Sequence, residues 1–205
     1  MVAEKIDQCM KPHGEEGIQT IENMNVNHKE ISKFAFECVT FNENAKIIDI
    51  GCGGGVNIEK FLKLTSGNVD GLDYSEVSVS ESIKRNSESV ENGRCNVIQA
   101  DVSNMPIKNE SYDLVSAFET IYFWPNITET FKEVFRIIKP HGQFMIAQGT
   151  DGNHPDDEKW LATVEGMSVY TAPELKKYLL NAGFKSVKSP VKENEHILVV
   201  IAQKD

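Results

Sequence analysis

Apolar residues recur along the chain in short runs that alternate between two periods. Continuous runs rich in β-branched residues, such as 46–50, predict buried strands. Stretches with apolar residues three or four positions apart, such as 56–64, predict amphipathic helices. Strands are expected at 46–50, 68–72, 95–100, 112–118, 143–147, 184–191 and 196–202, and helices at 27–40, 56–64, 75–92, 125–138 and 172–182. This alternation predicts an α/β fold with a mostly parallel sheet and one antiparallel strand.

Two segments lack such a pattern. Residues 1–26 are polar and rich in helix breakers, so they form either a loose tail or a lid over a ligand site. Residues 150–170 form an acidic insertion. The chain is therefore expected to hold an N-terminal segment at 1–26 and one domain at 27–205. Asn27 and Glu30 are spaced as a capping box for the first helix of that domain.

The composition narrows the classes of function. The 205 residues carry a net charge of −10, which argues against a nucleic-acid-binding surface, although the charge also serves solubility. No apolar run approaches the ~20 residues that span a bilayer, and the first residues lack the pattern of a secretory signal. The 4 cysteines are scattered without a C-x-x-C pair, so reduced thiols and no metal site are expected. These features predict a cytoplasmic protein without a nucleic-acid or membrane partner, and they leave the choice between monomer and homodimer open.

A glycine turn follows the first strand. Residues 49–55 read DIGCGGG, and glycines at the carboxyl end of a buried strand let a ligand approach the main chain. A dinucleotide fingerprint needs its third glycine where Val56 stands, and Asp49 lies inside the strand just before the turn. The Walker pattern is also absent, because no Lys-Ser or Lys-Thr pair follows the glycines. The turn therefore predicts a site for a nucleotide-like cofactor of another kind.

Carboxylates also follow the next two strands. Asp73 comes about 20 positions after the glycine turn, where a carboxylate holds a ribose diol, and Tyr74 beside it could cover an adenine ring. Asp73 could instead cap the next helix, although Ser75 suits that role better. Asp101 follows the third strand at its carboxyl end, and the alternative for it is a loop residue that caps a turn. All of these groups are expected on one edge of the sheet, where ligands of doubly wound folds bind.

Five segments, taken in order, resemble a known family. They are DIGCGGG (49–55), GLD (71–73), ADV (100–102), YDLV (112–115) and IKPHG (138–142). Together they resemble the class I S-adenosylmethionine-dependent methyltransferases of the small, type 11 kind, over residues 28–203. One departure is His141, where most members carry glycine, and it affects turn geometry and not chemistry. The resemblance implies a Rossmann-like doubly wound sheet of seven strands in the order 3-2-1-4-5-7-6, with S-adenosylmethionine as methyl donor.

The resemblance also implies the donor site. The donor carries a sulfonium, an ammonium and one carboxylate, and this net cation suits an acidic rim of strand ends. Asp101 would accept from the adenine amine, and the main chain at Val102 would meet the ring. Gly51, Gly53 and the main chain near Phe118 would contact the methionine part. The donor-binding residues predicted in this way are Asp49, Gly51, Cys52, Gly53, Asp73, Tyr74, Asp101, Val102 and Phe118.

The residues after the fourth strand are candidates for the acceptor side. Glu119 and Tyr122 are polar groups expected near the transferred methyl, and they are the predicted catalytic residues. With His28 and Trp124 they would line an aromatic, acidic pocket that suits an amine or another partly cationic acceptor. Two alternatives stay open at this point. Trp124 could be a core residue under the following helix, and His28 could be an ordinary surface or core histidine.

The sequence thus predicts an enzyme that transfers a methyl group to a small-molecule acceptor by in-line displacement. The alternative is a protein that binds the donor without catalysis, as a sensor or a partner subunit. A nicotinamide oxidoreductase is disfavoured by Val56 and Asp49. The acceptor itself depends on the two least patterned segments, 1–30 and 150–170, because loops carry specificity in such folds.

Overall fold

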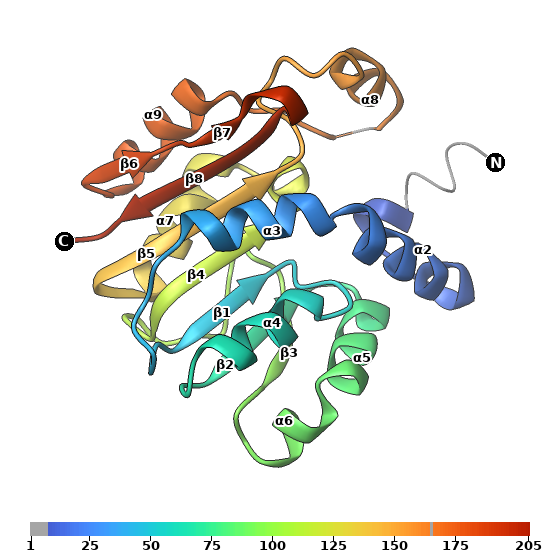
Figure 1. The fold of residues 1–205 in the computed structure, drawn as a ribbon, viewed down its shortest axis with the longest axis vertical. Coiled ribbons are helices and arrows are strands. Elements are labelled where there is room, and N and C mark those ends of the chain that lie inside the picture. The colour runs from blue at the N-terminus through green and yellow to red at the C-terminus, as the bar shows by residue number, and fades with distance from the viewer. Residues whose placement is uncertain (1–7, 165) are drawn as a thin grey trace.

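A single twisted sheet organises the structure, and helices cover both of its faces (Figure 1). The computed structural model describes residues 8–164 and 166–205. The strands are β1 (Ile47–Ile50), β2 (Val69–Asp73), β3 (Val97–Gln99), β4 (Tyr112–Phe118), β5 (Ile138–Gln148), β6 (Ser186–Lys188), β7 (Val191–Lys192) and β8 (Ile197–Gln203). Their order is β3-β2-β1-β4-β5-β8-β6, with β7 also paired to β8. The pairs from β3 to β5 are parallel, and β8 is antiparallel to β5.

Strands β6 and β7 are two parts of one edge strand. Both pair antiparallel with β8 in one continuous register. The interruption falls at Pro190, which has no N–H to donate, while its carbonyl still accepts from Val199 N at 3.0 Å. The predicted order 3-2-1-4-5-7-6 is therefore confirmed, with the sixth predicted strand split at the proline.

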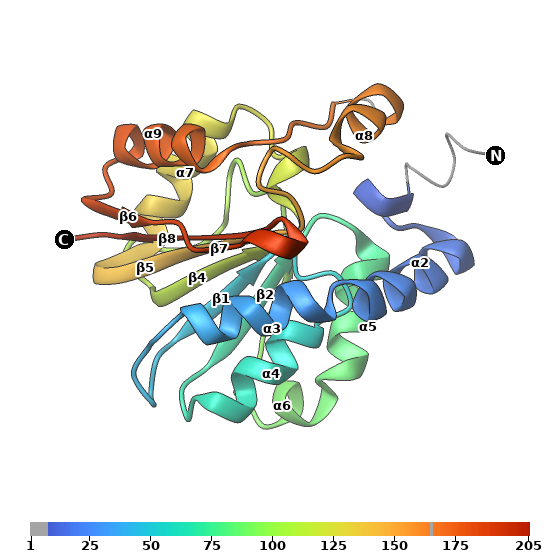
Figure 2. The same cartoon turned by 45° about the horizontal axis from the view of Figure 1, so that its top comes forward.

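Two sets of helices cover the two faces of the sheet. The helices are α2 (Gly14–Asn27), α3 (Lys29–Cys38), α4 (Val56–Leu64), α5 (Glu76–Arg85), α6 (Ser87–Glu91), α7 (Ile127–Ile137), α8 (Asp157–Thr163) and α9 (Ala172–Ala182), with short 3-10 turns η1 (Ile121–Phe123) and η2 (Glu193–Glu195). Figure 2 shows α3 to α6 on one face of the sheet and α7 with α9 on the other. The predicted doubly wound α/β class is confirmed.

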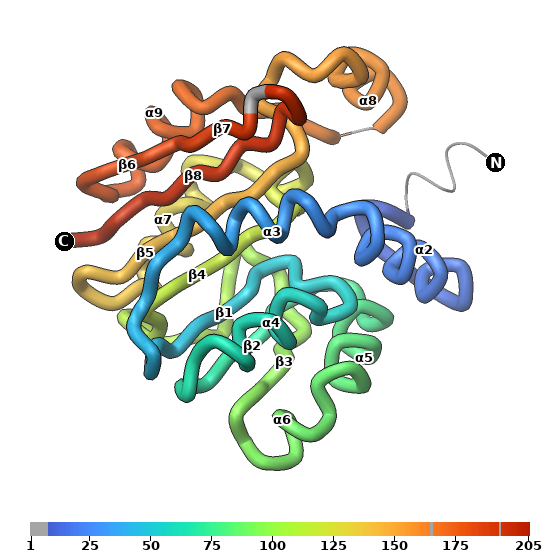
Figure 3. The backbone as a smooth tube through the Cα atoms, viewed as in Figure 1, coloured from blue at the N-terminus to red at the C-terminus, as the bar shows by residue number. Residues whose placement is uncertain are grey.

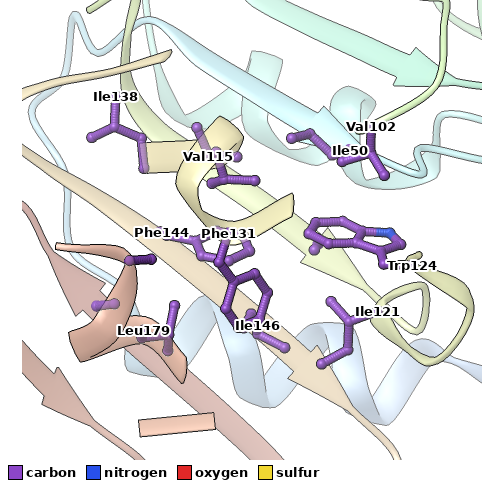
Figure 4. Packing of buried hydrophobic residues seen from close by; sticks show 14 of the residues in the cluster. Ile50, Val102, Val115, Ile121, Trp124, Phe131, Ile138, Phe144, Ile146 and Leu179 are labelled. Carbon is purple, nitrogen blue, oxygen red and sulfur yellow. The ribbon is translucent and has the colours of Figure 1, made fainter. Parts of the chain in front are cut away.

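Each face of the sheet has its own apolar core. Alternate residues of β1 serve opposite faces, because Ile47 packs in the core on the α4 side while Ile48 packs in the core on the α7 side. Burial on both faces explains why β1 reads as a continuous apolar run. Figure 4 shows part of the α7-side core, where the rings of Phe131 and Phe144 meet with centroids 5.6 Å apart.

Several helix ends lie where local sequence signals predict them. Helix α4 has the predicted bounds, and α9 begins at the capping box of Thr171 and Glu174 and ends at Gly183, whose φ is 115°. The helix expected at 75–92 is instead divided into α5 and α6 at Asn86. The Nδ2 of Asn86 donates to the Gly55 carbonyl at 3.1 Å, so this break is tied to the glycine turn.

The N-terminal segment differs most from the prediction. Residues 14–26, expected to be irregular, belong to α2, while residues 1–7 lie outside the described part of the chain. Helix α2 forms despite its glycines because Gly17 and Ile21, one turn apart, are buried, and Ile21 packs against Gly54 of the glycine turn. Tertiary packing has therefore overridden a weak helix propensity.

The start of α3 also differs from the prediction. The capping box expected from Asn27 and Glu30 is wrong, because Asn27 ends α2 and α3 begins after His28 without a side-chain cap. Figure 3 traces this direct passage from α2 into α3. His28 is thereby placed at the junction between the two helices.

Two further differences concern β5 and α7. The turn expected at 139–142 lies within β5, where the register with β4 shifts and exposed His141 adopts a φ of 63°. Helix α7 begins at Ile127 and not at residue 125, because Asn126 takes a left-handed conformation with a φ of 40°. Neither difference reaches the carboxyl ends of the central strands.

Candidate active site

The glycine turn presents bare main chain at the carboxyl end of β1. Gly51, Gly53 and Gly55 have φ values of 72°, 50° and 72°. A Cβ on Gly51 would lie 2.3 Å from Thr120 Oγ1, and a Cβ on Gly55 would lie 2.4 Å from Ser82 Oγ. The turn therefore needs glycine both for its backbone angles and for the close approach of its neighbours.

Asp73 holds this turn from the end of β2. Its Oδ2 accepts from Gly53 N and its Oδ1 accepts from Ser75 N, both at 2.9 Å. The cap of α5 is Ser75, as expected, because its Oγ accepts from Ser78 N at 3.2 Å. Burial raises the pKa of Asp73, and the main-chain donors oppose that shift. A positively charged or hydroxyl-bearing ligand would favour the charged form of this carboxyl.

Asp49 is a second buried carboxyl at the same edge. It is 1% exposed, and its Oδ1 accepts from Ser116 Oγ at 2.7 Å. Burial raises its pKa to about 7, the Ser116 hydrogen bond opposes the shift, and the charge of Asp73 adds to it. This carboxyl is therefore poised to respond to a nearby cation.

These groups line one cavity, here named the strand-end cavity. Of the predicted donor-binding residues it contains Asp49, Gly51, Cys52, Gly53, Asp73, Tyr74 and Phe118. Met10 and Pro12 of the N-terminal segment also line it, and they are tied to the end of β2, because Tyr74 OH donates to Met10 O at 2.5 Å and Ser75 Oγ donates to Pro12 O at 2.6 Å. The Gly51 and Cys52 N–H groups both donate to Leu72 O, so they hold β1 to β2.

Asp101 and Val102 line an adjoining cavity of about 260 Å³. Asp73 and Tyr74 line both cavities, so the predicted adenine end lies directly beside the predicted ribose end. Asp101 is exposed, and its Oδ1 accepts from Ser103 N at 2.7 Å and Ser103 Oγ at 2.6 Å. Asp101 therefore does cap the turn after β3, as the alternative interpretation expected. The role of Asp101 toward adenine stays a prediction.

Glu119 follows β4 with a φ of 55° and a largely buried carboxyl. Its Oε1 accepts from Tyr122 OH at 2.9 Å and from Gly149 N, and its Oε2 lies 3.9 Å from His28 Nε2. Burial raises the pKa of Glu119, while His28, Gly149 and Tyr122 each oppose that rise. The predicted catalytic residues Glu119 and Tyr122 are therefore in direct contact, with His28 beside them.

A third cavity of about 420 Å³, here named the outer cavity, also borders Glu119. Glu119, His28 and Phe123 line both it and the strand-end cavity. Its remaining wall comes from α2, α3, η1, the end of β5 and the predicted insertion, and includes Met24, Ile31, Tyr122, Gly149, Thr150, His154, Asp157, Trp160, Val164 and Met167. The two segments without a sequence pattern thus meet at the same cavity.

Trp124 does not line the outer cavity. Its ring stacks on Phe144 with centroids 6.1 Å apart, and its Nε1 donates to Thr120 Oγ1 at 3.2 Å. Figure 4 shows Trp124 among buried apolar side chains that include Ile121. The structure thus places Trp124 as the core residue that was the open alternative, with one edge on the adjoining cavity.

Sequence reasoning missed several residues of the strand-end cavity, above all Ser32, Asn57 and Lys60. Asn57 and Lys60 lie in the first turns of the helix that follows the glycine turn. Helical side chains tilt toward the helix N-terminus, so their positions carried a usable signal. Ser32 carried none, because its place depends on how α3 packs against α4.

Comparison with known proteins agrees with this geometry. A family model described as a methyltransferase domain matches residues 48–146. Residues 48–146 therefore form a methyltransferase domain of the class I, S-adenosylmethionine-dependent kind. The matched segment runs from β1 into β5 and includes most of the strand-end cavity.

Curated relatives of this chain include sterol methyltransferases. Cycloartenol-C-24-methyltransferase 1 of Oryza sativa subsp. japonica is 28% identical over 109 residues, which are 53% of this chain and 32% of the relative. The 24-methylenesterol C-methyltransferase 2 of Arabidopsis thaliana is 23% identical over 174 residues, which are 78% of this chain and 48% of the relative. The chain therefore spans less than half the length of either relative.

Solved structures share the fold of this chain. A SAM-dependent methyltransferase from Aquifex aeolicus superposes with a TM-score of 0.75 at 17% identity, covering 91% of this chain and 98% of that one. Phosphoethanolamine N-methyltransferase 2 of Haemonchus contortus, in complex with S-adenosyl-L-methionine, superposes with a TM-score of 0.72 at 12% identity. The superposition covers 85% of this chain and 52% of that one. The predicted family, fold class and type of methyl donor are confirmed.

Two features of the described residues bear on other partners. Within residues 8–164 and 166–205, every helix is too short or too polar to cross a lipid bilayer. In the same part of the chain, no three His, Cys, Asp or Glu side chains gather in a way that could hold a metal ion. The four cysteines are free thiols.

Proposed function

We propose that this methyltransferase transfers the methyl group of S-adenosylmethionine to a small-molecule acceptor at Glu119. The observation that carries the proposal is the shared wall of two cavities. The strand-end cavity has the carboxylates and bare main chain that suit the donor, and the outer cavity is lined by the same Glu119. A methyl group passed between two ligands needs such a junction, because the reacting atoms must come within about 3–3.5 Å of each other.

The residues of the strand-end cavity fit the parts of the donor. Asp73 would accept from the ribose hydroxyls, and Asp101 with the main chain at Val102 would meet the adenine ring beyond Tyr74. Gly51 would let the methionine part approach the main chain where any Cβ would collide with Thr120. Asp49 and Asp73, two buried carboxyls, would favour a cation and disfavour a pyrophosphate.

The donor supplies an activated methyl group on a sulfonium, which leaves as a neutral thioether. An electron pair of the acceptor forms the new bond to the methyl carbon while the sulfur keeps the electron pair of the old one. Glu119 takes a proton where the acceptor arrives protonated, and its raised pKa suits a base. Tyr122 and Gly149 fix the carboxyl through Oε1, which leaves Oε2 on the His28 side. The N-terminal segment acts as a lid that keeps water from the donor.

The outer cavity favours an acceptor with an apolar body and one reactive group. Met24, Ile31, Phe123 and Trp160 supply apolar walls, and Glu119 is placed to face the reactive group. The names of several curated relatives point to sterols. The apolar walls are compatible with such an acceptor, while Glu119 also suits the partly cationic acceptor predicted from the sequence. A cytoplasmic location and a monomeric or homodimeric state stay predictions.

Two measurements test this function. Calorimetry should show binding of S-adenosylhomocysteine, and Asp73→Ala should weaken that binding at least tenfold because the ribose contact is lost. Formation of S-adenosylhomocysteine should then be followed with a panel of sterols, long-chain amines and phenols. Absence of binding at millimolar concentration would refute the proposal. Binding without turnover on the whole panel would favour the alternative of a donor-binding protein.

A further inference from the structure

A lysine, a serine and an asparagine form a polar cluster between α3 and α4. Lys60 Nζ donates to Ser32 Oγ at 2.6 Å and to Asn57 Oδ1 at 3.4 Å, and Ser32 Oγ donates to Asn57 Oδ1 at 2.6 Å. Ser32 and Asn57 are 3% and 9% exposed. These bonds use two of the three hydrogens of the ammonium group and the oxygen of the amide, so one ammonium hydrogen and the amide NH₂ stay available as donors.

This cluster lines the strand-end cavity and is unlike the rest of its wall. Among the described residues that line the cavity, Lys60 is the only lysine or arginine, and the ionisable groups around it include the carboxyls of Asp49, Asp73 and Glu119. Lys60 is half-buried, and its ammonium lies 5.9 Å from the centroid of the Phe36 ring. Burial lowers the pKa of Lys60, and the nearby carboxyl of Asp49 opposes that shift.

An acidic cavity of this kind presents a problem for the proposed donor. Its sulfonium and ammonium groups suit carboxylates, but its own carboxylate would be repelled by them. A cation and neutral donors in one place would resolve the conflict. Lys60 and Asn57, in the first turns of α4, and Ser32, on the facing helix, supply them where the glycine turn ends.

We propose that Lys60, positioned by Ser32 and Asn57, binds the carboxylate of the donor's amino-acid tail and so selects ligands that carry this tail. The inference rests on the proposed function, because it assigns a residue to one part of the proposed donor. An ammonium–carboxylate pair in a half-buried site is stronger than the same pair on the surface, since water screens it less. The pair would also fix the tail relative to α3, the helix that begins beside His28.

The test compares two ligands that differ only in the tail. S-Adenosylhomocysteine carries the amino-acid carboxylate, whereas 5′-methylthioadenosine keeps the nucleoside and the thioether without it. Calorimetry with Lys60→Met should show at least a tenfold increase in the Kd of S-adenosylhomocysteine and less than a twofold change for methylthioadenosine. Lys60→Arg should recover most of the lost affinity, because it restores the cation.

Lys63→Met is the matched control on the same helix. Its side chain is 68% exposed and pairs with Glu59 at 2.6 Å, away from the cavity. Neither ligand should change its Kd in this variant. Circular dichroism should show that each variant is folded. If Lys60→Met does not fold, Ser32→Ala replaces it. This variant should raise the Kd of S-adenosylhomocysteine about threefold and leave the Kd of methylthioadenosine unchanged.

The outcomes separate the inference from the function on which it rests. An unchanged Kd for S-adenosylhomocysteine in Lys60→Met would overturn the inference alone. An equal increase in Kd for both ligands would also overturn it, because the cluster would then only hold α3 against α4. If the unaltered protein bound neither ligand, the proposed function would fail and the inference would fail with it.

Discussion

Replacing Asp49 by asparagine should flatten the dependence of stability on pH. The carboxyl is buried at the end of β1, and its pKa of about 7 lies well above the ordinary value of 3.8. Between these two values the folded protein holds a proton that the unfolded chain has released. The free energy of unfolding must therefore fall as pH rises through this window, and the loss levels off above pH 7.

The size of the effect follows from the same two values. One pH unit within the window changes the free energy of unfolding by about 1.36 kcal/mol. From pH 5 to pH 8 the charge on Asp49 should therefore destabilise the unaltered protein by roughly 2.7 kcal/mol, most of it by pH 7. The asparagine side chain has no proton to release at this position, and its oxygen could still accept the Ser116 hydrogen bond. The Asp49→Asn variant should lack this slope and become the more stable protein at high pH.

Urea unfolding followed by far-UV circular dichroism at pH 5, 6, 7 and 8 measures the difference. The stability of Asp49→Asn relative to the unaltered protein should rise by roughly 2.7 kcal/mol from pH 5 to pH 8, with the steepest rise below pH 7. Asp73 and Glu119 also have raised pKa values, but they are present in both proteins, so their contributions largely cancel. As a control, the free energy of unfolding of Glu129→Gln, on the exposed face of α7, should depend on pH in the same way as that of the unaltered protein. A constant difference between Asp49→Asn and the unaltered protein would refute the reasoning.

Three further predictions concern the strand ends. Glu119→Gln should lower kcat by roughly 10²–10⁴-fold, the usual range for a lost base, without lowering stability, because it removes a buried charge; a kcat within twofold of the unaltered protein would remove Glu119 from the mechanism. Tyr122→Phe removes a donor that lowers the pKa of Glu119, so the acidic limb of the rate profile should move to higher pH, and an unmoved profile would argue against the pair. Gly51→Ala should destabilise by about 1–3 kcal/mol and abolish donor binding, because its Cβ would collide with Thr120. Gly93→Ala is its control, since Gly93 has a similar φ of 79° with no atom within 4 Å of the added Cβ, and calorimetry should show unchanged donor binding.

The parts of the fold that follow from the sequence depend on neighbours in the chain. The capping box and the terminal glycine of α9 lie at the two ends of its own segment, and the turn after β1 is marked in the sequence by closely spaced glycines. The order of the strands followed from the family resemblance. The sequence pattern did not predict that Pro190 divides the edge strand into β6 and β7, which both pair with β8. The carboxyls at the ends of β1 and β2 were found because parallel strands bring their carboxyl ends to one edge.

The remaining features were decided by contacts between distant segments. Helix α2 is too rich in glycine and polar residues to be predicted, and it forms where Ile21 reaches the glycine turn. The burial of Trp124 depends on the stacking of its ring on Phe144 of β5. Lys60 acquires its place in the cavity from Ser32 on another helix.

The sequence by itself therefore determined the class of fold, the glycine turn and the edge of the sheet at which a ligand is expected. Only the tertiary structure decided how His28 meets Glu119 and where the outer cavity lies. The physical reason is the range of the interactions involved. Caps, turns and amphipathic periods act over a few residues, whereas the environment and pKa of a buried side chain depend on every segment packed around it.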